Sequence, residues 1–171
     1  MSSFPKTPAL MTDCVVFEPD GRVLLVRRKH EPFAGFYALP GGFVDVGETV
    51  EAACCREVRE ETGVSISKGQ LQFIGVYSDP ARDPRGHSVS IAYGTTLEEL
   101  VEPHPGSDAE AAEWVSDWRK VRLAFNHSEI LAHKIQLEEV DLDRHRQRIP
   151  LEPAGEDEVF WRGLEQKLRR A

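Results

Sequence analysis

One helix predicted from this sequence carries acidic residues on the face that should be buried. The helix spans 50–62, and at about 100° per residue one apolar arc of its surface contains Val50, Ala53, Cys54 and Val58. Glu57 and Glu61 fall inside the same arc, and Glu60 lies at its edge. Carboxylates brought together on a core-facing surface repel one another and lose hydration. This helix therefore needs a specific environment around its acidic residues.

Two interpretations of these carboxylates fit the helix geometry. In the first, a divalent cation neutralises them, and a set of oxygen ligands favours Mg²⁺ or Mn²⁺ over Zn²⁺. In the second, the acidic face is solvated and forms salt bridges with Arg56 and Arg59. The periodicity of the helix alone does not distinguish the two.

Apolar runs elsewhere predict an α/β fold with a mixed β-sheet between helices. Strands are predicted at 10–17, 22–28, 71–78, 88–97 and 113–116, and helices at 50–62 and 126–140. The first two strands flank a Pro-Asp-Gly turn and should form a hairpin. Thr49 and Gly63 are suitable caps for the first helix, and Asn126 with Glu129 resembles a capping box for the second.

The predicted elements indicate one domain followed by an extension. We expect residues 1–140 to form the domain, with a loose N-terminal arm at 1–9. Residues 141–171 should form a polar linker and then, from about residue 156, a C-terminal helix. The apolar stripe of that last helix would suit a homodimer contact.

The composition restricts the partners and the compartment. The 171 residues include 21 Lys and Arg and 29 Asp and Glu, which gives a formal net charge of −8. This charge argues against binding to nucleic acid or to an anionic membrane, and a phosphate-bearing ligand would need a cation to offset the repulsion. Three cysteines without a metal-binding motif suit a reducing compartment, so we expect a cytoplasmic protein. We find no apolar run long enough for a transmembrane helix and no signal peptide at the first residues.

The wider spacing around the acidic helix matches a known motif. The order G-x5-E-x7-R-E-U-x-E-E-x-G-U, with U apolar, is formed over 23 residues by Gly42, Glu48, Arg56, Glu57, Val58, Glu60, Glu61, Gly63 and Val64. Leu39-Pro40-Gly41 precedes it. The sequence therefore resembles a Nudix hydrolase. The resemblance implies a Nudix-type α/β/α sandwich and metal-dependent hydrolysis of a nucleoside diphosphate linked to another group.

The resemblance also implies roles for individual residues. The implied metal ligands are the carboxylates of Glu57, Glu60 and Glu61, with Glu60 acting directly or through water, and the carbonyl of Gly41. Glu48 and Arg56 resemble the ion pair that ties the loop to the helix. The general base is either a glutamate of the motif or an acid of the loop at 98–113, where Glu110 is our first candidate.

A second set of residues resembles the ADP-ribose pyrophosphatase branch of the family. Pro80 follows the Nudix box after 15 residues and lies within the segment 77–87, which contains Asp-Pro-Arg-Gly. The segment 32–40 upstream of the box also resembles that branch. The resemblance implies hydrolysis of ADP-ribose to AMP and ribose 5-phosphate.

Four side chains are candidates for substrate contacts. Arg82 and Arg85 could hold a phosphate, and Phe36 could stack on adenine. Arg28 ends a strand at a position where related enzymes often place a basic side chain that contacts phosphate. The alternatives are a charged turn for the first two arginines, a solvated strand end for Arg28, and ordinary core packing for Phe36.

Three functions remain open from the sequence. The first is an ADP-ribose pyrophosphatase, and the second is a nucleoside triphosphate pyrophosphatase that removes oxidised nucleotides. The third is a sensor that binds ADP-ribose without turnover and regulates a partner. The complete set of motif glutamates favours an enzyme, because a sensor need not retain every one of them.

Overall fold

The computed structural model describes residues 7–107 and 109–148. Its strands are β1 (Ala9–Phe17), β2 (Val23–Arg28), β3 (Tyr37–Ala38), β4 (Gly41–Phe43), β5 (Gln72–Tyr77), β6 (Ser88–Thr96) and β7 (Ala109–Val115). Its helices are α1 (Val50–Thr62) and α2 (His127–Arg148), with short 3-10 turns at Lys68–Gln70 and Trp118–Lys120. Neither α-helix, over the residues described, has the length and hydropathy needed to cross a bilayer.

The strands form the mixed sheet that the sequence predicts. Its main order is β3-β2-β1-β6-β5, while β4 pairs with β1 and β7 pairs with β2. β1 runs parallel to β6 along its whole length, and the other pairs are antiparallel. The predicted hairpin of β1 and β2 is confirmed.

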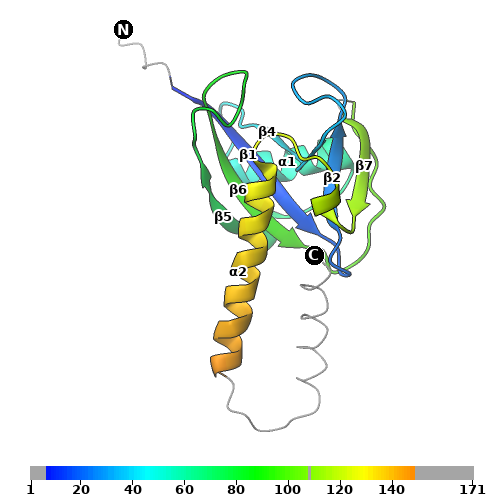
Figure 1. The fold of residues 1–171 in the computed structure, drawn as a ribbon, viewed down its shortest axis with the longest axis vertical. Helices are drawn as coiled ribbons and strands as arrows, with labels where there is room; N and C mark the ends of the chain where they lie inside the picture. The colour runs from blue at the N-terminus through cyan, green and yellow to red at the C-terminus, as the bar shows by residue number, and fades with distance from the viewer. Residues whose placement is uncertain (1–6, 108, 149–171) are drawn as a thin grey trace.

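The two helices cover opposite faces of the sheet. Successive side chains of a strand point to opposite faces. Val15 of β1 therefore packs in one buried cluster with Ile130 and Leu131 of α2, whereas Val16 packs in another with Val58 of α1. Figure 1 shows α2 in front of the sheet and α1 behind it. Burial on both faces explains why the first two strands are continuous apolar runs rather than alternating ones.

The sheet opens between β1 and β2, and this opening positions the site. The two strands share the register pair Phe17 and Val23 next to their turn. Farther from the turn, β1 pairs instead with β4, through Met11 and Phe43, and β2 pairs with β7. The ends of β1 and β2 therefore separate, and the cavity between them is lined by Glu57 and Glu61 from the second half of α1.

The caps predicted for α1 are confirmed. The Thr49 hydroxyl accepts a hydrogen bond from the N–H of Ala52 at 3.2 Å. At the other end, Gly63 has a left-handed φ of 70°, and its N–H donates to the carbonyl of Arg59. These caps set the first and last residues of α1 and so the positions of Glu57 and Glu61 along it.

Three boundaries differ from the sequence prediction. β7 begins at Ala109 rather than near Glu113, because pairing with β2 supports alanines that have little strand propensity of their own. α2 continues to Arg148, so the predicted end near 140 and the start of the predicted linker are wrong. The sequence from 141 to 148 is polar but has no Gly or Pro to stop a helix. The predicted final helix lies outside the described residues.

The start of α2 also differs from the predicted capping box. The N–H of Glu129 donates to the backbone carbonyl of Asn126 rather than to its side chain. The side-chain oxygen of Asn126 instead accepts a hydrogen bond from Nε of Arg82 at 3.1 Å. A tertiary contact therefore occupies the Asn126 oxygen, while its side-chain amide still donates to Oε2 of Glu129 at 3.1 Å.

Replacing Gly63 with alanine tests the C-terminal cap of α1. An added Cβ would come no closer than 3.5 Å to another atom, so the cost is the left-handed backbone itself. We expect Gly63→Ala to lower the free energy of unfolding by about 1 kcal/mol in chemical denaturation. Gly69→Ala is the matched control, because its added Cβ meets nothing within 4 Å and its φ is not left-handed. Equal effects of the two changes would contradict this account.

Candidate functional site

A cavity of about 490 Å³ opens where β1 and β2 separate. Its wall includes residues from β1, β2, β4, α1, the loop before β6 and the start of α2. Asp13, Arg28, Gly42, Glu57, Glu61 and Arg85 are among its lining residues. The structure thus brings together two glutamates of the motif and the three arginines that the sequence analysis selected, because Arg82 also lines the cavity.

Two glycines allow α1 to approach β4 closely. A Cβ on Gly42 would lie 2.5 Å from Oε1 of Glu57, and one on Gly41 would overlap the carbonyl of Thr12. The N–H of Gly41 donates a hydrogen bond to Oε2 of Glu61 at 3.0 Å. Both carboxylates therefore lie directly against the glycine pair, and both line the cavity.

Burial raises the pKa of both carboxyl groups. The pKa of Glu61 rises to about 8, mainly because of desolvation, and the negative charges of Glu57 and Asp13 add to the effect. The pKa of Glu57 is also raised by burial, although the neighbouring Arg56 opposes that shift. Glu61 forms no ion pair in the part of the chain that the structure describes. The site thus gathers two carboxyl groups whose ionisation burial opposes, and among the described residues Glu57 has an ion pair with Arg56 whereas Glu61 has none.

Arg56 connects the loop after β4 to α1. Its Nη2 donates to Glu48 at 2.7 Å and to the carbonyl of Phe43 at 3.0 Å. Its Nη1 donates to Glu57 at 2.7 Å and to Glu60 at 3.3 Å. The pairing expected for Glu48 and Arg56 is therefore present in the structure. The side chain of Glu60 is 52% exposed and is not among the residues that line the cavity.

The chemistry of these donors fits a hard divalent cation. No three His, Cys, Asp or Glu side chains of residues 7–107 and 109–148 are already gathered around one point. Proteins commonly hold Mg²⁺ with one or two carboxylates, waters and substrate phosphates rather than with a complete protein cage. Glu57, Glu61 and the carbonyl of Gly41 could supply that smaller set.

A buried network that the sequence analysis missed supports the floor of the cavity. The carboxylate of Asp13 on β1 accepts hydrogen bonds from Ser90 at 2.5 Å and from Nη2 of Arg82 at 3.2 Å. Its other oxygen faces Nε2 of His127 at 3.4 Å. Nδ1 of His127 accepts a hydrogen bond from the N–H of Leu39 at 2.9 Å. The network thus ties β1, β6 and α2 to the loop that leads into Gly41.

This network limits what two of its members can do. Both ring nitrogens of His127 face partners, and burial lowers its pKa, so it is a neutral positioning group rather than a base. Arg82, expected to contact substrate, is 3% exposed at its side chain and binds Asp13, Ser88 and Asn126. The one clue in the sequence was an aspartate within the apolar run of β1.

Arg28 and Arg85 meet over the ring of Phe125 on the cavity wall. Their guanidinium carbons lie 4.9 Å and 5.4 Å from the ring centroid. Asp83 pairs with Arg85 at 2.7 Å, whereas Arg28 donates hydrogen bonds to the carbonyls of Pro32 and His30. Burial and the nearby Arg85 lower the pKa of Arg28. Positive charge is therefore held at this wall without a carboxylate bound to Arg28.

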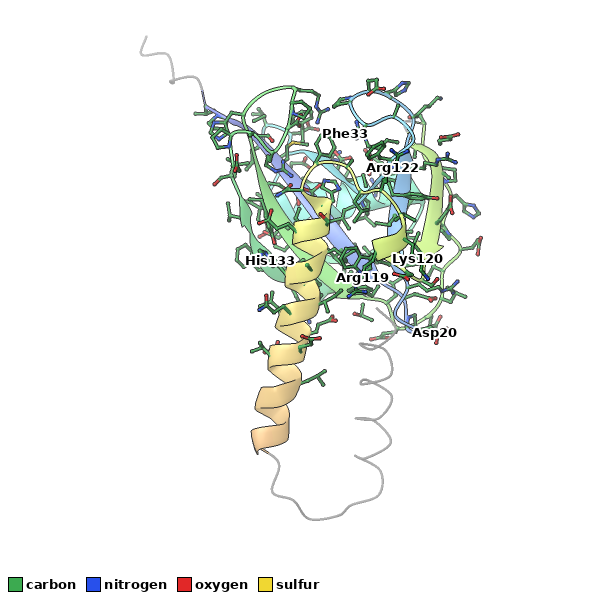
Figure 2. The ribbon with its side chains drawn as sticks, viewed as in Figure 1. Asp20, Phe33, Arg119, Lys120, Arg122 and His133 are labelled. Atoms are coloured by element: carbon green, nitrogen blue, oxygen red, sulfur yellow. The ribbon has the colours of Figure 1, made fainter. Side chains whose placement is uncertain are left out.

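Like Glu60, two further candidates lie outside the cavity lining. Phe36 packs against Phe33, and Arg122 lies 4.6 Å over its ring; Figure 2 shows Phe33 and Arg122 on the same side of the molecule. Glu110 is on β7 rather than in a loop, is 54% exposed, and pairs with Arg27 at 3.5 Å. Neither Phe36 nor Glu110 is among the residues that line the cavity.

The raised pKa of Glu61 predicts how the stability of the metal-free protein depends on pH. The folded protein keeps the proton to about pH 8, whereas the unfolded chain releases it near the ordinary value of 4.5. Stability should therefore fall as the pH rises between these values. In Glu61→Gln this fall should shrink, and the Tm above pH 8 should exceed that of wild type by roughly 3 °C. If thermal unfolding gives the same dependence of Tm on pH for both proteins, the raised pKa of Glu61 is contradicted.

Comparisons with known proteins agree with this geometry. A family model described as the NUDIX domain matches residues 7–134. The ADP-ribose pyrophosphatase of Methanocaldococcus jannaschii is 44% identical over 126 residues, which is 72% of this chain and 71% of that protein. The ADPR responsive transcriptional repressor NtrR of Acinetobacter baylyi is 31% identical over 137 residues, or 76% of this chain and 54% of that protein.

A solved structure is also similar. It is a bifunctional NMN adenylyltransferase/ADP ribose pyrophosphatase from Francisella tularensis, complexed with AMP and a Mn ion. It superposes with a TM-score of 0.68 at 28% identity and covers 80% of this chain and 43% of that one. The match over residues 7–134, together with the 44% identity, shows that this chain belongs to the Nudix family of hydrolases.

Proposed function

We propose that this protein hydrolyses the pyrophosphate bond of ADP-ribose to give AMP and ribose 5-phosphate. The observation that carries the proposal is that Glu57, Glu61, Arg28 and Arg85 line the same cavity. A diphosphate has the charge and the size to reach from one set to the other. The identity with an ADP-ribose pyrophosphatase supports this choice of substrate.

We propose Mg²⁺ or Mn²⁺ as the cofactor, held by Glu57, Glu61 and the carbonyl of Gly41. When bound, such an ion neutralises phosphate charge and lowers the pKa of a bound water. Glu60 would act through water, because its side chain is half exposed beside Arg56. The general base is proposed to be a carboxylate of the cavity wall rather than Glu110, which pairs with Arg27 on β7.

The remaining residues are proposed to bind or orient. Arg28 and Arg85 would attract the phosphates from the wall opposite the glutamates. Arg56 fixes the position of Glu57 and of the loop that carries Glu48. Asp13 and His127 hold the segment that leads to Gly41. The protein's own contribution is therefore a set of fixed charges around a site for a diphosphate.

A sensor of ADP-ribose is the second candidate function. The observation that favours it is the similarity to an ADPR responsive transcriptional repressor. The net charge of −8 opposes direct binding to DNA. We keep the enzyme as the first proposal because Glu57 and Glu61 are both present and both face the cavity.

The proposed compartment of the protein is a reducing cytoplasm. Its proposed binding partner is the nucleotide substrate. Cys14, Cys54 and Cys55 are all free thiols in the structure, as such a compartment would keep them. A homodimer through the predicted last helix remains a proposal from the sequence.

Glutamine substitutions test the catalytic proposal. We expect Glu57→Gln and Glu61→Gln each to lower kcat for ADP-ribose by roughly 100-fold or more at saturating Mg²⁺. The half-exposed Glu60 provides the comparison, and Glu60→Gln should lose less activity. The release of AMP is the measurement. Near-normal turnover in both variants would contradict the site, and tight ADP-ribose binding by wild type without AMP release would favour the sensor.

A pair of arginine variants tests substrate selection. Wild type should have a kcat/KM for ADP-ribose at least about tenfold above that for any nucleoside triphosphate. Arg85→Ala should reduce this ratio and should lower the free energy of unfolding less than Arg82→Ala does, because the Arg85 side chain is 43% exposed although its partner Asp83 is buried. Arg82→Ala should instead lower that free energy by about 3 kcal/mol, because Asp13 would be buried without its cation. A wild-type preference for a triphosphate would assign the chain to the alternative substrate class.

A further inference from the structure

The cavity has two walls of different chemistry. The wall formed by β2 and the following loop is cationic, with Arg28 and Lys29 among its residues. The wall formed by β1 and β4 is different, because Met11 and Phe43 line it there and are cross-strand partners. Phe43 is 51% exposed, and unlike the similarly exposed Phe73 it lines the cavity.

Phe43 is the phenylalanine of the cavity wall whose ring is not already engaged. Phe125 also lines the cavity, but Arg28 and Arg85 lie over its ring. Phe36 does not line the cavity. Among the described residues, Phe43 has no aromatic or cationic contact with its ring. An aromatic face is therefore available at this wall.

The backbone holds Phe43 firmly beside the glutamates. Its register partner in the sheet is Met11, and its carbonyl accepts a hydrogen bond from Nη2 of Arg56 at 3.0 Å. The preceding residue is Gly42, which lies against the carboxylate of Glu57. The ring is thus attached to the same rigid segment that positions the proposed hydrolytic site.

We propose that Phe43, with Met11 beside it, is the platform on which the adenine of the substrate stacks. This inference rests on the proposed function and adds the orientation of ADP-ribose in the cavity. The neutral adenosine end lies on the wall of β1 and β4, the diphosphate lies at Glu57 and Glu61, and the terminal ribose lies toward Arg28 and Arg85. Phe43 takes the role that the sequence analysis gave to Phe36.

The two products allow the two ends of the cavity to be tested separately. AMP carries the adenine, whereas ribose 5-phosphate carries only the sugar and phosphate of the other end. We expect Phe43→Ala to raise the Kd of AMP about fivefold to tenfold, as loss of one base–aromatic stack does. The Kd of ribose 5-phosphate should change less than about twofold, within experimental scatter for an untouched site. Both constants are measured by calorimetry with Mg²⁺ present.

Two further variants complete the design. Phe43→Tyr keeps the ring and should retain the affinity of wild type for AMP. Phe73→Ala removes another exposed phenylalanine, which is 59% exposed on β5 and outside the cavity lining, and should change neither constant. Thermal unfolding checks that each variant is folded.

The proposal has definite contrary outcomes. It is overturned if Phe43→Ala binds AMP with the affinity of wild type, or if this change weakens the binding of both products equally. It is also overturned if AMP binding is weakened instead by His30→Ala, a change on the cationic wall. It is also overturned if wild type binds AMP no better than ribose 5-phosphate. Because calorimetry needs no turnover, a failure to hydrolyse ADP-ribose would reject the proposed function while these constants still decide the orientation.

Discussion

Glu57 and Glu61 lie against two glycines of β4, and the rest of the site depends on this contact. A side chain at Gly42 would occupy the position of the Glu57 carboxylate, so α1 could not stay at its present distance from the sheet. At that distance the carboxylates lose water, and their pKa values rise because of burial. The same contact brings Arg56 within reach of both the loop and the helix.

The sequence predicted this part of the site well because its determinants are local. Thr49 and Gly63 cap α1 at the expected residues, and the spacing from Gly42 to Gly63 lies within one loop and one helix. Helical periodicity then decides that Glu57 and Glu61 share a face. Five of the seven strands were also predicted from their apolar runs, whereas the short β3 and β4 were not. Where pairing with another strand outweighs propensity, as in β7, the predicted boundary was four residues late.

The supporting network could not be predicted from the sequence because its members are far apart along the chain. Asp13 meets Ser90, Arg82 and His127 only after β1, β6 and α2 have packed together. An isolated arginine in a polar turn is typical of a surface residue or a phosphate contact. The neighbouring sequence does not indicate that Arg82 will pair with a buried aspartate. The same holds for Phe125, whose ring becomes a support for arginines through tertiary packing alone.

The partners of the arginines then explain why the site needs a cation. Asp13 and Asp83 compensate Arg82 and Arg85, whereas Arg28 bonds to backbone carbonyls and keeps its charge. This charge attracts a diphosphate into the cavity, whereas the carboxylates of Glu57 and Glu61 repel it once they are ionised. A substrate held across both walls is therefore stable only when positive charge is placed beside the glutamates. Because no basic side chain of the described residues forms an ion pair with Glu61, a bound divalent ion is the simplest way to complete the site.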